Sequence, residues 1–186
     1  MMNKLFKNVA LLAAVVISVN LNAQIGGTVN VGGEAMYPMK NIVENAVNSK
    51  AHTTLVAAVK AAGLVETLQS AGPFTVFAPV NDAFENLPSG TVETLLKPEN
   101  KATLTKVLTY HVLSGKYDFA KLWAMIEKGD TKLKTVSGGT LMIAANGPHN
   151  IIVKDENGNS ANITTYDVIQ SNGIIHSIDA VLLPKM

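Results

Sequence analysis

"GPFTVFAPVNDAF", residues 72–84, is the stretch of sequence that decides the fold. Its first half is rich in β-branched and aromatic residues and ends at a proline, which predicts a short buried strand over residues 74–79. A helix is expected to begin at once, because Asn81 or Asp82 can accept hydrogen bonds from the free N–H groups of a first turn. Glu85 follows Asp82 at the spacing of a capping box. A strand that turns directly into a capped helix explains this stretch without any catalytic chemistry.

Helical periodicity covers most of the chain around this strand, as far as residue 129. Apolar residues recur every three or four positions, and glycines stand at the ends of the segments. The predicted helices are 41–47, 53–63, 64–70, 89–98, 98–109 and 118–129, and residues 110–117 are predicted to be a short strand and turn. These segments make up the helical first half of the chain.

Beyond residue 130 the pattern changes to strands. Apolar and β-branched runs are separated by "SGG", "NGP", "ENGN" and "SNG", which are typical of antiparallel hairpin turns. The predicted strands are 131–136, 139–145, 150–155, 161–170 and 173–184. Helices followed by a sheet-rich half favour an α+β domain.

The N-terminus has the features of a secretory signal peptide. Lys4 and Lys7 precede an apolar run, residues 9–19, that is too short to span a bilayer comfortably. Cleavage is predicted between Ala23 and Gln24, so residues 1–23 form the signal peptide. Two glycine pairs in residues 24–38 predict a flexible lead, and residues 39–186 form the single domain.

Composition excludes several classes of protein. The chain has no cysteine, which rules out disulfides, thiolate chemistry and a lipid-bearing cysteine. A formal net charge of +1 without a cluster of Lys and Arg argues against nucleic-acid binding. No second long apolar run is present, so no membrane span is expected. The mature protein is therefore expected to be periplasmic or extracellular and to depend on its hydrophobic core for stability.

Four blocks of sequence resemble the fasciclin-like domain. They are "GPFTVFAPVNDAF", "LTYHVLSGKY", "LKTVSGGTL" and "SNGIIHSIDAVLLP", and the similarity runs over residues 41–184. One departure is Val80, where the family commonly has threonine. The resemblance implies a wedge or sandwich of antiparallel sheet with helices packed around it, and a non-catalytic role in adhesion. The signature residues expected to be structural are Thr75, Phe77, Ala78, Pro79, Asn81, Asp82, Phe84, Asn172, Gly173, His176 and Asp179.

Tyr110 and His111 match the tyrosine-histidine motif that the family associates with adhesion contacts. On a strand, these two neighbours point to opposite faces, so one of them is expected to point inward. A histidine beside leucine is more often a hydrogen-bonded core residue than a contact. Both interpretations, contact and core, therefore stand for this pair.

His176 and Trp123 are the other two aromatic candidates. His176 shares a strand face with isoleucines, while Asp179 lies on the other face, which favours a structural histidine over a catalytic pair. Trp123 falls outside the apolar stripe of its predicted helix, so it is a candidate contact residue.

No catalytic or metal-binding pattern is present in the sequence. There is no G-x-S-x-G motif, no close helical pair of histidines and no calcium loop, so neither cofactor nor metal is expected.

The leading prediction is an exported bacterial adhesion module whose partner is a cell-surface or matrix protein or a polysaccharide. One alternative is a carrier of a small hydrophobic ligand, since the methionines would suit an adaptable pocket. A weaker one is a hydrolase that acts on polymers.

Overall fold

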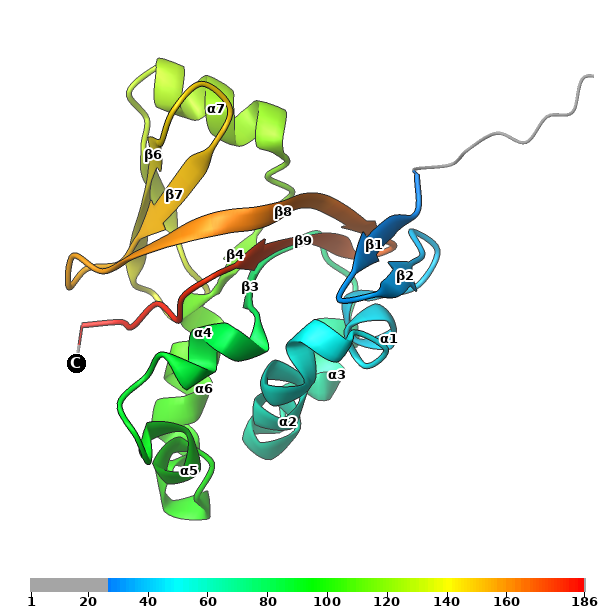
Figure 1. Ribbon diagram of the computed structural model, residues 1–186, viewed down its shortest axis with the longest axis vertical. Helices are drawn as coiled ribbons and strands as arrows, with labels where there is room; N and C mark the ends of the chain where they lie inside the picture. Colours follow the sequence, from blue (N-terminus) through cyan, green and yellow to red (C-terminus); the bar gives the residue numbers. More distant parts are fainter. Residues whose placement is uncertain (1–26, 186) are drawn as a thin grey trace, which may run out of the picture.

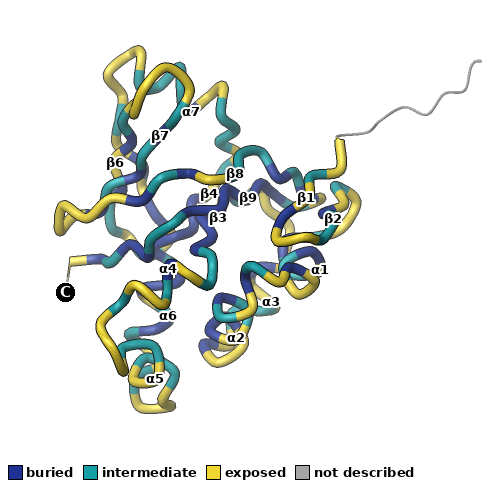
Figure 2. The backbone as a smooth tube through the Cα atoms, in the orientation of Figure 1, coloured by how far each residue is buried: buried dark blue, intermediate teal, exposed yellow. Residues whose placement is uncertain are grey.

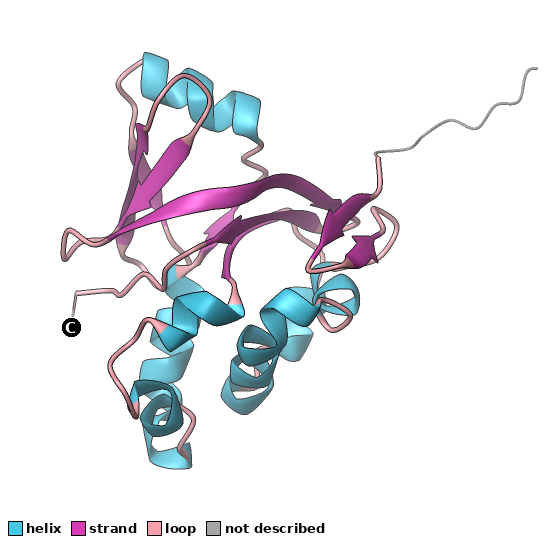
Figure 3. Ribbon diagram, in the orientation of Figure 1, coloured by secondary structure: helices cyan, strands magenta, loops and turns pink. Residues whose placement is uncertain are grey.

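A computed structural model describes residues 27–185, so the predicted signal peptide lies outside the described residues (Figure 1). The helices and strands expected after residue 40 are confirmed, with shifts of up to six residues at their ends (Figure 3). The α-helices are α1 Ile42–Ala46, α2 Thr53–Ala62, α3 Val65–Gln69, α4 Asn81–Glu85, α5 Thr91–Leu95, α6 Lys101–Tyr110 and α7 Phe119–Glu127. Short 3₁₀ turns cover Lys50–His52 and Pro98–Asn100. The strands are β1 Val29–Val31, β2 Glu34–Met36, β3 Phe74–Pro79, β4 Val112–Ser114, β5 Lys132–Lys134, β6 Thr140–Ala145, β7 Ile151–Lys154, β8 Ser160–Gln170 and β9 Gly173–Ile178.

Seven strands form one mixed sheet in the order β4-β3-β9-β8-β7-β6-β5. All neighbours pair antiparallel except β3 and β9, which run parallel. The two ends of the sheet approach each other, because Leu113 bridges Thr135 and the Val136 N–H donates to the Val112 carbonyl at 2.8 Å. The expectation of an antiparallel wedge is therefore wrong in detail, and the sheet is a nearly closed, barrel-like one. The long chain between β3 and β9 leaves room for the crossover that a parallel pair requires.

The interior of this curved sheet is filled by one apolar cluster, which we call the barrel core. Its largest members are less than 2% exposed. It consists of Phe77, Tyr110, Leu113, Leu122, Leu133, Leu141, Ile143, Ile151, Val153, Ala161, Ile163, Ile178 and Leu182. Helix α7 lies beside β6 and β7 and closes this end of the molecule (Figure 1).

The opposite face of β3 and β9 is covered by helices, and its apolar cluster is the helix-side core. Val76 and Ala78 of β3 and Ile175 of β9 point into it, together with residues of α1, α2, α3 and α6. The alternate residues Phe77 and Ile178 point into the barrel core. Strands β3 and β9 are thus buried on both faces, as Figure 2 shows in dark blue. This double burial explains why the opening stretch is apolar almost throughout.

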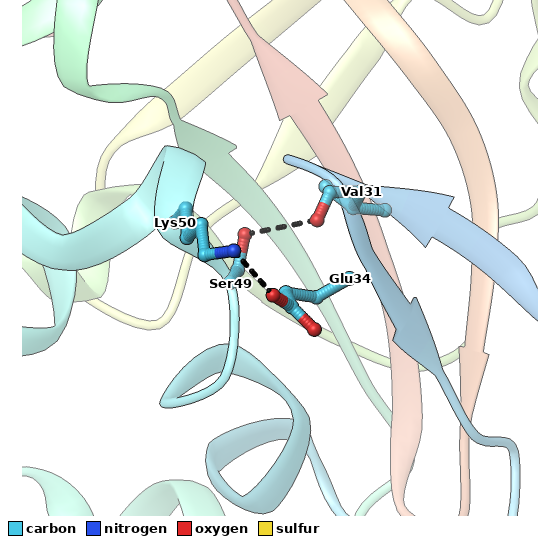
Figure 4. A network of polar contacts seen from close by, with 4 residues as sticks. All are labelled: Val31, Glu34, Ser49 and Lys50. Atoms are coloured by element: carbon cyan, nitrogen blue, oxygen red, sulfur yellow. Dashed lines mark hydrogen bonds and ion pairs between the residues drawn. The ribbon is translucent and has the colours of Figure 1, made fainter.

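Residues 29–36, within the predicted flexible lead, are packed against the domain. Strands β1 and β2 pair in a hairpin whose turn is Gly32-Gly33, and Val31 and Met36 belong to the helix-side core. The hairpin is also held from outside (Figure 4), because Lys50 Nζ lies 2.8 Å from Glu34 Oε1 and Ser49 Oγ donates to the Val31 carbonyl at 3.4 Å. The glycine pairs indicated flexibility, but here one of them makes a hairpin turn that buries its flanking apolar residues.

Asn81 does not cap its own helix, which corrects that part of the prediction. The N-cap of α4 is Val80, which has no side-chain hydrogen bond. Asn81 Oδ1 instead accepts from the Thr54 N–H at 3.1 Å, and its Nδ2 donates to the Lys50 carbonyl at 2.8 Å. The asparagine therefore caps the start of α2 across space and ties α4 to it.

Asn172, in the turn between β8 and β9, has a similar role. Its Oδ1 accepts from the first N–H of α1, that of Ile42, at 3.0 Å. Its Nδ2 donates to the Leu68 and Ser70 carbonyls at 2.8 and 2.9 Å, which satisfies the C-terminal end of α3. One side chain thus fixes two helices against the sheet.

In residues 27–185 we find no helix that is both long and apolar enough to cross a membrane.

Candidate binding surfaces

Tyr110 lies at the end of helix α6 and not on a strand, so the predicted strand begins two residues later, at Val112. Its ring is fully buried in the barrel core. The hydroxyl donates to the Thr140 carbonyl at 2.8 Å and accepts from the Glu156 N–H at 3.1 Å. Burial raises the pKa of Tyr110 to about 12. The side chain therefore ties α6 to β6 and to the β7–β8 turn as a neutral phenol.

His111 is the C-cap residue of α6 and is also buried, with 3% of its surface exposed. Its Nδ1 donates to the Val107 carbonyl at 2.8 Å, and its Nε2 accepts from the Leu182 N–H at 3.0 Å. Burial lowers the pKa of His111 to about 4. The expectation that only one of the pair points inward is wrong, because a helix end places both side chains inside.

His176 points into the barrel interior, stacked on Phe77 at a centroid distance of 5.7 Å. Its Nε2 donates to the Tyr117 carbonyl at 2.7 Å and its Nδ1 accepts from the Asp167 N–H at 3.3 Å. Burial lowers the pKa of His176. Asp179 does not face it, since the Asp179 carboxylate accepts from the backbone and side chain of Asn162.

Most of the remaining signature residues are also held by internal contacts. Thr75 Oγ1 donates to the Gly115 carbonyl at 2.7 Å and accepts from the Tyr117 N–H at 2.9 Å. Gly173 must be glycine, because a Cβ there would lie 2.2 Å from the carbonyl oxygen of Phe74. Ala78 and Pro79 are buried in β3, Phe84 is half-buried, and Asp82 is exposed.

Trp123 is the predicted contact residue that reaches the surface. Its ring is half-buried on α7, stacked on Phe119 at 5.6 Å, and its Nε1 donates to Glu127 at 3.0 Å. The exposed His149, from the β6–β7 loop, lies 6.5 Å from the same ring. Trp123 and His149 together form what we call the aromatic surface patch.

An apolar cavity of about 90 Å³ lies between the helices and the outer face of the sheet. Its walls come from the β1–β2 hairpin, helices α1, α2, α3 and α6, and strands β3, β4 and β9. The polar side chains in the wall, such as His52 and His111, have hydrogen-bond partners in the protein. Lys60 is the one formally charged side chain of the wall.

Three features of these sites did not emerge from the sequence. His149 joins Trp123 only through the fold, because 25 residues separate them. Asn81 and Asn172 act on helices that are distant in the chain. The third feature is the apolar cavity, whose wall brings together residues from across the chain. The spacing of His52, Val56 and Lys60, four residues apart each time, is a signal in the sequence for one side of that wall.

These features define an α+β domain built on a mixed, nearly closed sheet with a buried tyrosine-histidine pair. The family model "Fasciclin domain" matches residues 50–184. The chain belongs to the fasciclin domain family. The β1–β2 hairpin and α1 precede the matched residues.

Relatives and solved structures agree with this assignment. Protein sll1483 of Synechocystis sp. is 49% identical over 147 residues, which cover 78% of this chain and 74% of that protein. The transforming growth factor-beta-induced protein ig-h3 of Sus scrofa is 33% identical over 79% of this chain, which spans 20% of that protein. The FAS1 domain pair of the insect cell adhesion molecule Fasciclin I matches with a TM-score of 0.69 at 20% identity, over 78% of this chain and 51% of the other. The likeness to the insect structure is one of fold.

Proposed function

We propose that this protein is an exported, non-catalytic binding module of the adhesion type. The observation that carries the proposal is membership of the fasciclin domain family, whose structural match here is a domain pair from a cell adhesion molecule. The predicted signal peptide over residues 1–23 supports export to the periplasm or the cell exterior.

The hydrogen bonding of the buried histidines supports a non-catalytic role. Both ring nitrogens of His111 and of His176 are bonded to backbone groups. A general base needs a ring nitrogen that is free to take a proton from a substrate, and burial also lowers the pKa of both groups. These histidines therefore support the fold and are poorly placed for proton transfer.

We place the partner-binding site at the aromatic surface patch. Trp123 presents part of a large ring beside an exposed imidazole, and aromatic groups of this kind contribute strongly when a partner covers them. The proposed partner is a cell-surface or matrix protein or a polysaccharide. Tyr110 and His111 have a positioning role in this proposal, because both are buried and tether the end of α6.

Binding of the purified protein to matrix proteins, surface polysaccharides and cells of its own host tests the proposal. We expect saturable binding that Trp123→Ala and His149→Ala each weaken by about tenfold, the loss of a moderate hot-spot contact. His149→Ala is the cleaner variant, since its exposed ring is not part of the barrel core. Met39→Ala is the matched control, because Met39 is 84% exposed and lies outside the patch. Equal weakening by all three variants would contradict the proposed site.

A carrier of a small hydrophobic ligand is the second candidate, favoured by the apolar cavity. Adhesion and carriage are compatible, because the cavity and the aromatic surface patch have no residue in common. Native mass spectrometry of protein purified from its own host tests carriage directly. A retained small molecule supports the carrier function, and a mass equal to that of the polypeptide alone counts against it.

A further inference from the structure

Strands β5, β6 and β7 present an outward face that is rich in lysine. Their inward residues fill the barrel core, are no more than 2% exposed, and include Leu133, Leu141, Ile143, Ile151 and Val153. Because side chains alternate along a strand, the residues between these point outward. We call this surface the basic sheet face, and it consists of Lys132, Lys134, Thr140, Met142, Ala144, Ile152 and Lys154.

The register of the strands brings the three lysines of this face together. Lys132 of β5 lies opposite Met142 of β6, and Met142 lies opposite Lys154 of β7. Since neighbouring strands are about 4.8 Å apart, Lys132 and Lys154 stand about 10 Å apart across the sheet, and Lys134 follows Lys132 at about 7 Å along β5. These spacings are close to the screening length of about 8 Å at physiological ionic strength. The three charges therefore act on a partner as one positive field.

No acidic side chain pairs with these lysines. The only ion pair among residues 27–185 joins Lys50 to Glu34, so the three ammonium groups have no carboxylate partner in the described part of the chain. Glu156, in the turn after β7, lies at the rim of the face. Its carboxylate accepts from the Thr140 N–H at 3.0 Å and from the Lys185 N–H at 3.3 Å. The positive charge of the face is thus left for an external anion.

The basic sheet face is also open to solvent. Lys132 and Lys134 are exposed, Lys154 is half-exposed, and Met142 is 41% exposed, so none of the described helices covers them. Helix α7 lies beside β6 but contributes Leu122 to the barrel core, which places it on the inner side of the sheet (Figure 1).

We propose that the basic sheet face binds a linear acidic polysaccharide, one that carries carboxylate or sulfate groups. The site goes beyond the aromatic surface patch and shares no residue with it, but the proposal rests on the proposed export of the protein. Charge complementarity selects an anion. Lysines spread over an open sheet face are separate point charges, which suit an extended chain with repeated charges better than a single small anion.

Nucleic acid and anionic lipid fit this face less well. The chain has no arginine, the residue that binds phosphate through two parallel hydrogen bonds. None of the outward residues is aromatic, so no platform for stacked bases is present on the face. Met142 and Ile152 are its only large apolar side chains, which is little for insertion into a bilayer surface.

Binding of the purified protein to dextran, dextran sulfate and polygalacturonate tests the charge requirement. By biolayer interferometry we expect binding to the two acidic polymers and not to neutral dextran. The affinity should fall by about tenfold from about 50 to about 200 mM salt, because released counterions favour a contact of this kind. Equal binding to dextran, or no binding to either acidic polymer at low salt, would overturn the proposal. Duplex DNA or phosphatidylglycerol vesicles that bind as tightly as polygalacturonate would overturn the choice of polysaccharide.

Two triple variants with the same change in net charge locate the site. Replacement of Lys132, Lys134 and Lys154 by glutamine should weaken polygalacturonate binding by about thirtyfold, at about threefold for each exposed charge. The matched control replaces three exposed lysines of the helical half, Lys60, Lys97 and Lys101, and should change the affinity by less than about twofold. Equal weakening by both variants would show that net charge and not this face binds the polymer.

Met142 offers a test that a folding defect cannot imitate. Met142→Lys adds a fourth charge between Lys132 and Lys154 and should tighten polygalacturonate binding by about threefold, whereas Met142→Gln should leave it unchanged. No gain in affinity for Met142→Lys would place the polymer elsewhere.

The outcomes separate this inference from the proposed adhesion site. His149→Ala should bind polygalacturonate as the unchanged protein does, and the lysine variant of the sheet face should keep any binding that depends on the aromatic surface patch. Loss of polygalacturonate binding in His149→Ala would overturn the assignment to the sheet face. A failure of host-cell binding beside intact, lysine-dependent polymer binding would overturn the adhesion site alone.

Discussion

The barrel core and the helix-side core share strands β3 and β9 but are filled differently. Inside the barrel, Leu141 and Ile151 are fully buried from neighbouring strands, and Tyr110 spans the interior with both hydroxyl bonds made. On the other face, equally apolar residues leave a cavity of about 90 Å³. Hydrogen bonds between the strands fix the curvature of the sheet. The space that the sheet encloses therefore has a fixed size, and side chains fill it. Helices as short as α1 and α3, with five residues each, touch the sheet at few points and leave space between them.

The largest expected effect comes from truncating leucines in the two regions. Leu141→Ala should lower the free energy of unfolding by about 4 kcal/mol, because the closed barrel cannot relax around the void. Leu55→Ala, at the wall of the existing cavity, should cost about 2 kcal/mol, because fewer contacts are lost. Urea unfolding of both variants measures the difference. Equal losses would mean that the two cores are equally well packed.

The pH dependence of the free energy of unfolding measures how well the helix-side region excludes water, because His111 lines the cavity. Burial lowers the pKa of His111 from 6.5 to about 4, so between these values the unfolded chain binds the proton and the folded chain does not. Stability is therefore complete above pH 6.5 and falls as the pH drops towards 4, by up to about 3 kcal/mol from this group.

The measurement is urea unfolding at intervals from pH 7 to pH 4, with His111→Gln as the variant. The variant should be less stable at pH 7 but should lose less stability on acidification. His52 and His176 also have lowered pKa values. In the variant, these two groups still make the free energy of unfolding fall as the pH drops. An identical slope in the variant would show that water reaches His111 in the folded protein.

The smallest effect concerns the hairpin that covers the helix-side core. Gly32 and Gly33 both have left-handed φ values, +62° and +81°, so alanine at either position is strained by about 1 kcal/mol. A Cβ at Gly32 would also lie 2.6 Å from the backbone nitrogen of Ala51, whereas a Cβ at Gly33 meets nothing within 4 Å. Gly32→Ala should thus cost about 2 kcal/mol and Gly33→Ala about 1 kcal/mol.

Hydrogen exchange of the hairpin amides provides the readout. Faster exchange of β1 and β2 in Gly32→Ala than in Gly33→Ala is expected, because only the first variant pushes the hairpin off the turn before α2. If both variants exchange alike, the hairpin is held by its own strand pairing and not by packing on the helix-side core.

Much of the fold could be predicted from the sequence because local chemistry determines it. The period of the apolar residues placed α2, α6 and α7, and the run from Phe74 to Pro79 placed β3. The turn from β3 into α4 was also correct, but the role of Asn81 was not, because its partner Thr54 lies 27 residues earlier in the chain. The buried tyrosine-histidine pair was assigned to a strand, since two residues at a helix end carry no period of their own.

The sequence by itself determined the order of the helices and strands after residue 40, the burial of β3 and the resemblance to a known domain family, because periodicity and turn residues act over a few positions. Only the tertiary structure decided that the sheet is mixed and nearly closed, that Gly32-Gly33 folds a hairpin onto the core, and that the helices leave an apolar cavity against the sheet. These features depend on contacts between residues far apart in the chain. Such contacts leave no local pattern, because each is fixed by the packing of the whole domain.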